Sequence, residues 1–495
     1  MNVPRPIRVC EQVLDTDVVV VGAGAAGLYT AIRAARDGGR VVLISATPLA
    51  QTASYWAQGG LAAALATEDS PELHLSDTER AGRGSVRRSA AEVLVTEAPG
   101  CVQDLQTLGV RFDADRFGRL ALGLEGGHSL RRVVHAGGSA TGRRVVRQLS
   151  ALAVKEPGIT VLEGARARSL CMSEDRVCGV LCQDGLAIGA RAVVLSTGGA
   201  AALWQRTTNP PGSQGVGLLL AHDAGAQLAD LEFVQFHPTA VIGVRGREGF
   251  LITEAIRGEG ATLHDRDGER FVDELAPRDE VSRAIQARLE ETASESVGLD
   301  MRAIDPALFP NVVGALRKAG LDPSRQLIPV APAAHYMMGG ILTDLDARSS
   351  VAGLYAVGES ACTGLHGANR LASNSLSECF VFAARAAARA LGEPTQPPLQ
   401  LAEVVQCGPA GVTAVSASTR AALWRDAGIE RDAEGLSRLG SDPHPLARMI
   451  ARCALERNES RGAHRRTDHP DSDPRLDHRH VVLAGQLEVS WQSWN

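Results

Sequence analysis

Apolar and polar positions near the start of the chain follow the order strand, helix, strand. Apolar runs occupy residues 17–21 and 40–44, and a helix-like stretch at 28–36 separates them. Residues 22–27 join the first run to the helix and contain three glycines. A glycine-rich turn between a strand and a helix is typical of a β-α-β unit that holds a dinucleotide. We therefore predict that a dinucleotide binds at this turn.

Each glycine of the turn has a physical task in such a unit. Gly22 permits the tight turn, Gly24 lets the backbone approach a pyrophosphate, and Gly27 lets the helix pack closely on the strand. The amide groups at the start of the helix then point at the phosphates. The cofactor contacts predicted here are Gly22, Ala23, Gly24, Ala25, Ala26 and Gly27.

The end of the second apolar run helps to choose between dinucleotides. It closes with Ile44, Ser45 and Ala46, so it lacks the carboxylate with which many such units hold a ribose hydroxyl. Two later apolar runs, at 192–195 and 353–357, also end in glycine-containing turns. Three cradling segments spread along the chain suit the long cofactor FAD, and NAD(P) is the weaker choice.

The pattern of elements changes twice along the chain. Up to about residue 230 strands alternate with helical stretches, whereas the next hundred residues are rich in His, Arg and Glu and have shorter apolar runs. Sequence typical of a cofactor-binding domain then returns at residues 339–391. We expect an α/β fold with a Rossmann-like FAD-binding domain at residues 1–230 and 336–395, interrupted by an α+β capping domain at 231–335 and followed by a C-terminal helical domain and tail at 396–495.

The composition excludes several classes of protein. The chain has 495 residues and a formal net charge of −6, which argues against a general nucleic-acid binder. No apolar run approaches the ~20 residues that a membrane span needs, and residues 1–12 lack an apolar signal core. The nine cysteines form no metal-ligand pattern. We therefore expect a cytoplasmic enzyme with reduced thiols, without metal, membrane or nucleic-acid partners.

Cationic side chains gather among the apolar segments of the predicted capping domain and just after it. Taken singly, each has a structural explanation, such as a histidine in a hydrogen-bonded loop or an arginine on an exposed helix face. Two histidines and two arginines that converged near a flavin would instead bind a small dianion, because arginine holds a carboxylate through two parallel hydrogen bonds. The candidates are His237, Thr253, Glu254, Arg283, His335 and Arg370.

Four short motifs make this set specific: His-Pro-Thr at 237–239, Thr-Glu-Ala at 253–255, Arg-Gly-Glu-Gly at 257–260 and Gly-Ala-Asn-Arg at 367–370. With them, the chain from Asp17 to about Leu391 resembles the succinate dehydrogenase and fumarate reductase flavoprotein family, most closely its L-aspartate oxidase branch. The resemblance implies a mobile capping domain and a C4 dicarboxylate held between this domain and the flavin.

The resemblance also implies a reaction. FAD would oxidise L-aspartate to iminosuccinate, and dioxygen, giving hydrogen peroxide, or fumarate would take the electrons. In the family this is the first step of quinolinate and NAD biosynthesis, and the product passes to quinolinate synthase.

Roles follow residue by residue from the matching motifs. His237, His335 and Arg370 bind the substrate carboxylates, with Thr253 and Glu254 beside them. Arg283 matches the family's proton-transferring arginine, and Glu254 or Glu259 can relay the proton, because the free pKa of arginine lies far above neutral. Glu125 matches the glutamate near the substrate ammonium in aspartate oxidases. A buried carboxylate would repel a dianion that lacks such a positive group.

The flavin contacts include a glycine-permissive segment and two later positions. Ala53 stands where membrane-bound succinate dehydrogenases carry a histidine that attaches FAD covalently, so the FAD is expected to be noncovalent. Ala46 stands where some aspartate oxidases have a lysine, and Val216 stands where the family usually has an acidic residue. Both differences are expected to weaken FAD binding. The contacts predicted here are Ser45, Ala53, Ser54, Tyr55, Trp56, Ala57, Gln58, Gly59, Gly60, Glu359, Ser375 and Leu376.

Two alternatives remain open at this stage. A soluble fumarate reductase or succinate dehydrogenase flavoprotein subunit would share most of these residues, although Glu125 and Ala53 weigh against it. The tail from Ser460, dense in Arg, His, Asp and Pro, is expected to be irregular. Its arginines and histidines between 457 and 480 could hold nucleic acid, but acidic residues interleave with them.

Overall fold

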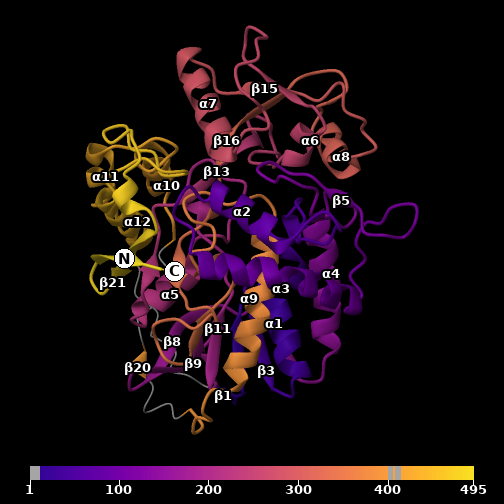
Figure 1. Ribbon diagram of the computed structural model, residues 1–495. Coiled ribbons are helices and arrows are strands. Elements are labelled where there is room, and N and C mark those ends of the chain that lie inside the picture. The colour runs from indigo at the N-terminus through magenta and orange to yellow at the C-terminus, as the bar shows by residue number, and fades with distance from the viewer. Residues whose placement is uncertain (1–11, 400–404, 407–413, 495) are drawn as a thin grey trace.

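The computed structural model describes residues 12–399, 405–406 and 414–494 (Figure 1). A sheet of strand order β18-β11-β2-β3-β7 forms its centre, and all its neighbouring strands pair in parallel. The predicted β-α-β unit is present as β2, α1 and β3, and the two later apolar runs form β11 and β18. These elements span Val18–Val21 (β2), Ala25–Arg36 (α1), Val41–Ser45 (β3), Ile159–Glu163 (β7), Ala192–Leu195 (β11) and Leu354–Ala356 (β18).

Alternate side chains of β2 enter two different cores. Val18 and Val20 pack with helices on one face of the sheet, whereas Val19 and Val21 pack with a second sheet on the other face. A strand covered on both faces is apolar throughout, as this one is. The helices are α1, α3 (Arg88–Thr107), α4 (Thr141–Lys155) and α9 (Asn374–Leu391), and α2 (Pro71–Ala81) packs on α3.

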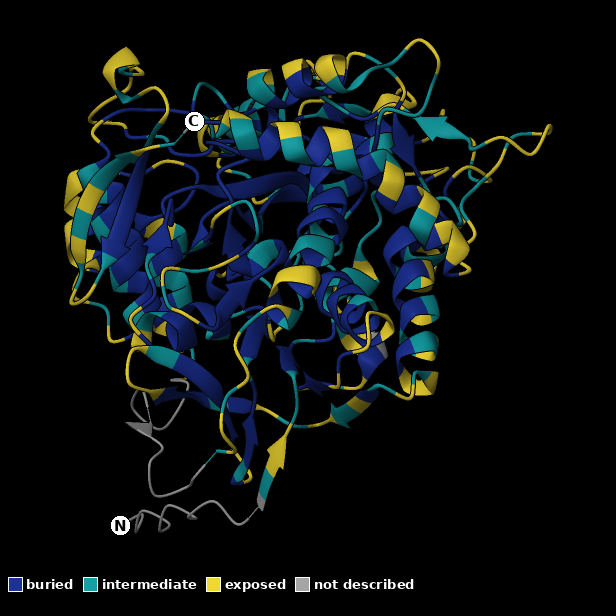
Figure 2. Ribbon diagram, turned by 60° about the horizontal axis from the view of Figure 1, so that its bottom comes forward, coloured by how far each residue is buried: buried dark blue, intermediate teal, exposed yellow. Residues whose placement is uncertain are grey.

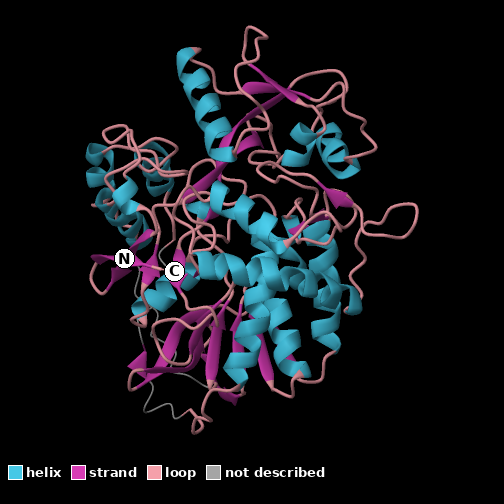
Figure 3. Ribbon diagram, in the orientation of Figure 1, coloured by secondary structure: helices cyan, strands magenta, loops and turns pink. Residues whose placement is uncertain are grey.

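The second sheet has the strand order β1-β10-β9-β8-β20. In the lower part of Figure 3, helices lie on one side and most of the strands on the other. Figure 2 shows that the central strands are buried. The strands span Gln12–Asp15 (β1), Ala167–Ser173 (β8), Arg176–Cys182 (β9), Leu186–Gly189 (β10) and Val405–Gln406 (β20).

An α+β unit with its own apolar core stands above this body in Figure 1. Its sheet has the order β13-β16-β15-β14, and every pair of neighbouring strands is antiparallel. The elements span Val234–Val241 (β13), Glu254–Gly258 (α6), Thr262–His264 (β14), Arg278–Glu291 (α7), Val297–Asp300 (β15), Pro310–Lys318 (α8) and Ile328–Met337 (β16). The predicted fold class, a cofactor domain interrupted by an α+β unit, is confirmed.

The C-terminal region contains helices α10 (Ala417–Asp426), α11 (Ala433–Leu439) and α12 (Pro445–Glu456). The prediction of an irregular tail after Ser460 holds for residues 460–478, which form turns, isolated bridges and one short 3-10 helix, but it is wrong for residues 479–493. Strands β21 (Arg479–Ala484) and β22 (Glu488–Ser493) complete a sheet of order β19-β17-β12-β21-β22. Its other strands are β12 (Leu228–Ala229), β17 (Gly340–Leu342) and β19 (Ala361–Cys362).

Buried ion pairs explain why this charged segment is ordered. Arg457 is fully buried and contacts Glu232 at 2.7 Å and Glu459 at 2.9 Å. Arg466 is also buried and contacts Asp468 at 2.7 Å. These two arginines are therefore occupied within the fold and are not available to nucleic acid.

A few short elements complete the described part of the fold. A small sheet of order β4-β6-β5 consists of Leu61–Ala62, Val133–Val134 and Leu122–Gly123, and α5 spans Val216–Asp223. The turn before α1 has the geometry its glycines require. Gly22 has a φ of +111°, and a Cβ there would overlap the Ser196 carbonyl; a Cβ on Gly27 would overlap the carbonyl oxygen of Gly22.

Candidate active site

A cavity with an empty volume of about 1170 Å³, partly open to solvent, lies between the central sheet and the capping unit. One end of it is formed by the turn before α1, by the short 3-10 helix Ala53–Trp56 and by the loops after β11 and β18. The other end is formed by β13, β16, α6 and α7 of the capping unit together with the segment before α9. Segments far apart in the sequence therefore share one site.

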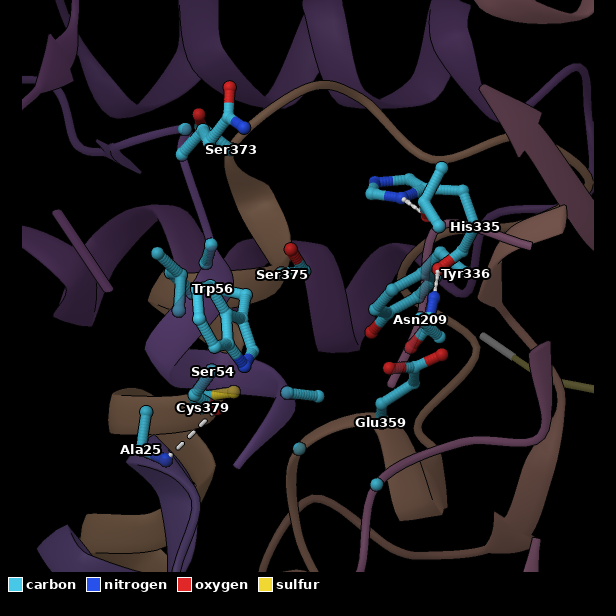
Figure 4. A pocket seen from close by; sticks show the side chains of 18 of the residues that line it. Ala25, Ser54, Trp56, Asn209, His335, Tyr336, Glu359, Ser373, Ser375 and Cys379 are labelled. Atoms are coloured by element: carbon cyan, nitrogen blue, oxygen red, sulfur yellow. Dashed lines mark hydrogen bonds between the residues drawn. The ribbon is translucent and has the colours of Figure 1, made fainter. Parts of the chain in front are cut away.

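Most of the predicted cofactor contacts line the first end of this cavity. Figure 4 shows Ala25 and Ser54 on one side and Glu359 on another. The predicted residues that line the cavity are Gly24, Ala25, Ala26, Ala53, Ser54, Trp56, Ala57, Gln58, Gly59, Gly60, Glu359, Ser375 and Leu376.

Five predicted cofactor contacts do not line the cavity. Gly22 and Gly27 shape the turn by their close backbone contacts, and Ala23 is buried behind it. The Ser45 hydroxyl donates a hydrogen bond to the Thr47 carbonyl oxygen instead. Tyr55 packs against the apolar core beside α1.

The chemistry of this end fits FAD. Helix α1 begins after Gly24 without a side-chain cap, so its first amides are available to a pyrophosphate, although the Ala25 amide donates to Ser54 Oγ at 3.1 Å. Glu359 is a half-buried carboxyl that lines the cavity and accepts a 3.0 Å hydrogen bond from the Met337 amide. Burial raises the pKa of Glu359 to about 7. Because this carboxyl faces the cavity, it could also accept a hydrogen bond from a ribose hydroxyl.

The opposite end gathers two arginines around one amide. Gln235 Oε1 accepts hydrogen bonds from Arg278 Nη1 at 3.1 Å and from Arg370 Nη2 at 3.1 Å. Arg370 also donates to Ser375 Oγ at 2.6 Å and lies 4.6 Å from the centre of the Tyr336 ring. Burial and the charge of Arg278 lower the pKa of Arg370 to about 10. The two guanidiniums form an electropositive end suited to carboxylates.

Two histidines lie beside these arginines. The rings of His237 and His335 meet edge to face with centroids 5.1 Å apart. Burial and the charges of nearby arginines lower the pKa of both imidazoles well below 6.5. The Thr239 amide donates to Nδ1 of His237 at 3.2 Å, so a neutral His237 carries its proton on Nε2. Both histidines therefore act at neutral pH as hydrogen-bonding groups without charge.

Glu125 brings a negative charge to the same cavity. Its side chain is buried, accepts a 2.6 Å hydrogen bond from Ser373 Oγ and lies 3.3 Å from His135 Nε2. Burial would raise the pKa of this carboxyl, but the hydrogen bond and charge of His135, with the Ser373 hydroxyl, outweigh burial and lower it to about 2. Glu125 is ionised at neutral pH.

The structure brings His237, Thr253, Glu254, His335, Arg370 and Glu125 together, but it does not bring Arg283 to them. The arginine of α7 that lines the cavity is Arg278, whose Nε donates to Glu254 Oε2 at 2.7 Å. Residues five apart on a helix point about 140° apart. Arg283 accordingly lines two other cavities, and its Nε donates to the Asp279 carbonyl oxygen at 3.3 Å.

The two later turns that were predicted to hold the cofactor do line the cavity, through Ser196 and Gly198 after β11 and through Val357 and Gly358 after β18. Sequence reasoning missed several other residues of the cavity. Arg278 had a usable signal, since it directly follows the Pro277 that begins α7. No sequence signal marks the remaining lining residues Thr208, Asn209, Pro210, Leu251, Tyr336, Ser373 and Cys379.

Known proteins resemble the chain over nearly its whole length. Residues 17–376 match the FAD binding domain, and residues 441–492 match the fumarate reductase flavoprotein C-terminal region. An L-aspartate oxidase of Caulobacter vibrioides is 46% identical, over 94% of this chain and 96% of its own. One of Streptomyces coelicolor is 42% identical, over 94% of this chain and 91% of its own.

The chain belongs to the L-aspartate oxidase family. Among solved structures, the FrdA chain of E. coli quinol fumarate reductase has a TM-score of 0.85 at 26% identity, with 98% of this chain and 97% of that chain covered. As a member of the L-aspartate oxidase family, the protein is a FAD-dependent oxidoreductase. None of the helices among the described residues combines the length and apolar character that a membrane crossing needs.

Proposed function

We propose that the cavity oxidises L-aspartate to iminosuccinate with FAD. The observation that carries this proposal is the ionised Glu125, which lines the same cavity as Arg278 and Arg370. The two arginines suit the two carboxylates of a C4 dicarboxylate, and Glu125 suits an ammonium between them. L-Aspartate is the C4 dicarboxylate with that group.

Carboxylate binding falls to the arginines and the neutral histidines. Arg278 donates through Nε to Glu254 and through Nη1 to Gln235. Its Nη2 has no hydrogen-bond partner among the described residues. That nitrogen is left for a substrate carboxylate or for proton transfer. Nε2–H of His237 supplies an uncharged donor to the same substrate. Charge-assisted hydrogen bonds of this kind contribute about 1.5–3 kcal/mol each.

We assign removal of the substrate proton to Arg278, and we assign to Glu254 the role of receiving a proton from Arg278. Glu254 is buried and lies between two arginines: its Oε2 accepts from Arg278, and its Oε1 is 3.7 Å from Arg257 Nη2. Burial would raise the pKa of Glu254, but the charges of Arg278 and Arg257 outweigh burial and lower it. Arg278 can take a proton from the substrate only as its own Nε–H proton passes to the ionised Glu254, which then holds the proton. This replaces the role that the sequence motifs assigned to Arg283.

The chemistry that bound FAD would supply is acceptance of the substrate Cα hydrogen as hydride, with dioxygen or fumarate as the final electron acceptor. The protein orients the Cα–H bond and excludes water from the charged groups. The Ala53 backbone lines the cofactor end without a histidine side chain, which supports noncovalent FAD.

The rival function is that of a fumarate reductase or succinate dehydrogenase flavoprotein. The structural likeness to E. coli fumarate reductase favours it. Glu125 opposes it, because succinate and fumarate offer no cation to this buried carboxylate. We therefore place L-aspartate first, with other C4 dicarboxylates as weaker ligands.

The product and its fate follow from the chemistry. Iminosuccinate is an imine that water hydrolyses, so an enzyme that consumes it must receive it quickly. We infer a functional hand-off to quinolinate synthase, with both proteins in the cytoplasm. Pull-down and co-fractionation of the two proteins from cell extracts test this inference.

Anaerobic mixing tests the proposed function directly. L-Aspartate is expected to bleach the visible absorbance of the bound FAD, and succinate at the same concentration is expected to bleach it far more slowly. Reduction by succinate alone would instead favour the rival flavoprotein function.

A further inference from the structure

A second cavity lies on a face of α7 other than the one that carries Arg278. It has an empty volume of about 870 Å³, and the proposed reaction uses none of its charged groups. Three parts of the fold line it: Arg83 after α2, residues 279–283 of α7, and the C-terminal segment 460–472. We call it the arginine cavity, after Arg83, Arg283, Arg461 and Arg465.

Two of these arginines are committed to carboxylates. Arg83 lies 3.3 Å from Asp279 and 2.5 Å from Glu280. Arg461 lies 2.8 Å from Glu459, and its Nη2 lies 2.7 Å from Asp477. These pairs neutralise their own charges and leave little attraction for a further anion.

The other two arginines have no such partner. No described carboxylate lies within 4.0 Å of the guanidinium of Arg283 or of Arg465. Arg283 Nε donates to the Asp279 carbonyl oxygen at 3.3 Å, and Arg465 Nη1 donates to the Pro470 carbonyl oxygen at 2.5 Å. The cavity also contains Asp471, for which no ion pair is found among the described residues. Two uncommitted cations thus face one uncommitted anion, and both cations are half-buried.

We propose that the arginine cavity binds a phosphate group of a small molecule between Arg283 and Arg465. Each guanidinium has free N–H donors, and a tetrahedral phosphate presents three oxygens that can receive donors from two directions. A planar carboxylate has two oxygens and is satisfied by one guanidinium. The volume admits a ligand larger than inorganic phosphate, so a diphosphate is the stronger candidate.

The position of Arg283 gives this site a consequence for the active site. Arg283 and Arg278 belong to the same helix, while Arg465 belongs to the C-terminal segment. A phosphate held by Arg283 and Arg465 joins α7 to that segment. Because Arg278 begins α7, the bound phosphate limits the movement of the arginine that contacts Glu254.

Calorimetric titration of the FAD-loaded protein with inorganic pyrophosphate tests the site, with sodium chloride at matched ionic strength as reference. The FAD-loaded protein is used because bound FAD occupies the cofactor end of the active-site cavity, so that pyrophosphate cannot bind there. Saturable binding with one ligand per chain is expected. Arg283→Gln and Arg465→Gln are each expected to weaken it at least about tenfold. Arg288→Gln, also on α7 but paired with Asp265 and Glu291, is expected to leave the affinity within about twofold.

Hydrogen exchange of the amides of α7 tests the coupling in the same samples. Pyrophosphate is expected to slow exchange in α7 of the unsubstituted protein and of Arg288→Gln, but not of Arg283→Gln. FAD content and the circular dichroism spectrum show whether each variant is folded. Absence of saturable binding, or equal binding by all the variants, overturns the site. Saturable binding without slower exchange overturns the coupling.

Discussion

Arg278 Nε donates a 2.7 Å hydrogen bond to Oε2 of Glu254, and both side chains are buried in the capping unit. The partners come from different helices, since Glu254 begins α6 and Arg278 begins α7. Arg257 lies on the opposite side of the carboxylate at 3.7 Å. This arrangement fixes Arg278 and, in the proposed reaction, places a carboxylate beside it that can receive a proton.

Glu254→Gln is therefore expected to slow turnover. Glutamine keeps a hydrogen-bond acceptor for Arg278 but cannot receive a proton, and positioned acid–base groups contribute about 10²–10⁴-fold to rate. We expect kcat with L-aspartate to fall about a hundredfold or more while FAD stays bound, as steady-state kinetics and the flavin spectrum will show. Glu259→Gln is the matched control, because Glu259 is exposed. A larger loss in Glu259→Gln than in Glu254→Gln would assign the relay to Glu259.

Glu125→Gln is expected to reduce the preference for L-aspartate over succinate. The buried carboxylate attracts the ammonium and repels a ligand without one, and the neutral amide does neither. The ratio of reduction efficiency between the two substrates is expected to fall about tenfold to a hundredfold. Rapid anaerobic mixing with each substrate measures it. Glu72→Gln, an exposed glutamate of α2, serves as control, and an unchanged ratio in Glu125→Gln would show that the carboxylate does not recognise the ammonium.

The contact between His135 and Glu125 predicts a pH-dependent part of stability. Burial lowers the pKa of His135, but the hydrogen bond and charge of Glu125 outweigh burial and raise it above 6.5. A raised histidine pKa stabilises the folded state fully below the unfolded pKa, and this contribution is lost as pH rises through the folded pKa. His135→Gln is thus expected to lower the free energy of unfolding more at pH 5.5 than at pH 9. Urea unfolding at the two pH values checks this, with the exposed His469→Gln as control; equal losses at both pH values would contradict it.

Much of this architecture follows from patterns that are local in the chain. The valines of β2, the glycine turn and the apolar face of α1 define the β-α-β unit, because strand and helix periods differ. The motifs around His237, Glu254 and Arg370 likewise mark the substrate end. Local patterns fail where partners are distant in sequence: the order of the C-terminal segment depends on Arg457 meeting Glu232 inside the fold.

The sequence pointed to Arg283, whereas the structure places Arg278 in the active-site cavity, and this error has a different cause. Both lie in the first turns of α7, and the sequence gives the helix but not its rotation about its axis. That rotation is set by packing, for example by the hydrogen bond from Ser282 Oγ to the Phe236 carbonyl oxygen at 3.0 Å. It turns Arg278 toward Glu254 and Arg283 toward the C-terminal segment.

The cofactor end predicts that FAD leaves the protein on unfolding. Ala53 lines the cavity and offers no nucleophile for a covalent link to the flavin. After acid precipitation, all of the yellow absorbance is expected in the supernatant and none in the pellet. Flavin retained in a washed pellet would point to attachment through another residue.

Paired substitutions in α7 test the central claim most directly. Arg278→Leu and Arg283→Leu change the same residue type in the same helix, and the FAD content of each shows that it is folded. Anaerobic mixing with L-aspartate is expected to leave the flavin of Arg278→Leu oxidised. The flavin of Arg283→Leu is expected to be reduced at a rate within about threefold of that of the unsubstituted protein, a change of less than about 1 kcal/mol in the barrier, because Arg283 does not line the active-site cavity. Fast reduction in Arg278→Leu together with none in Arg283→Leu would contradict the account.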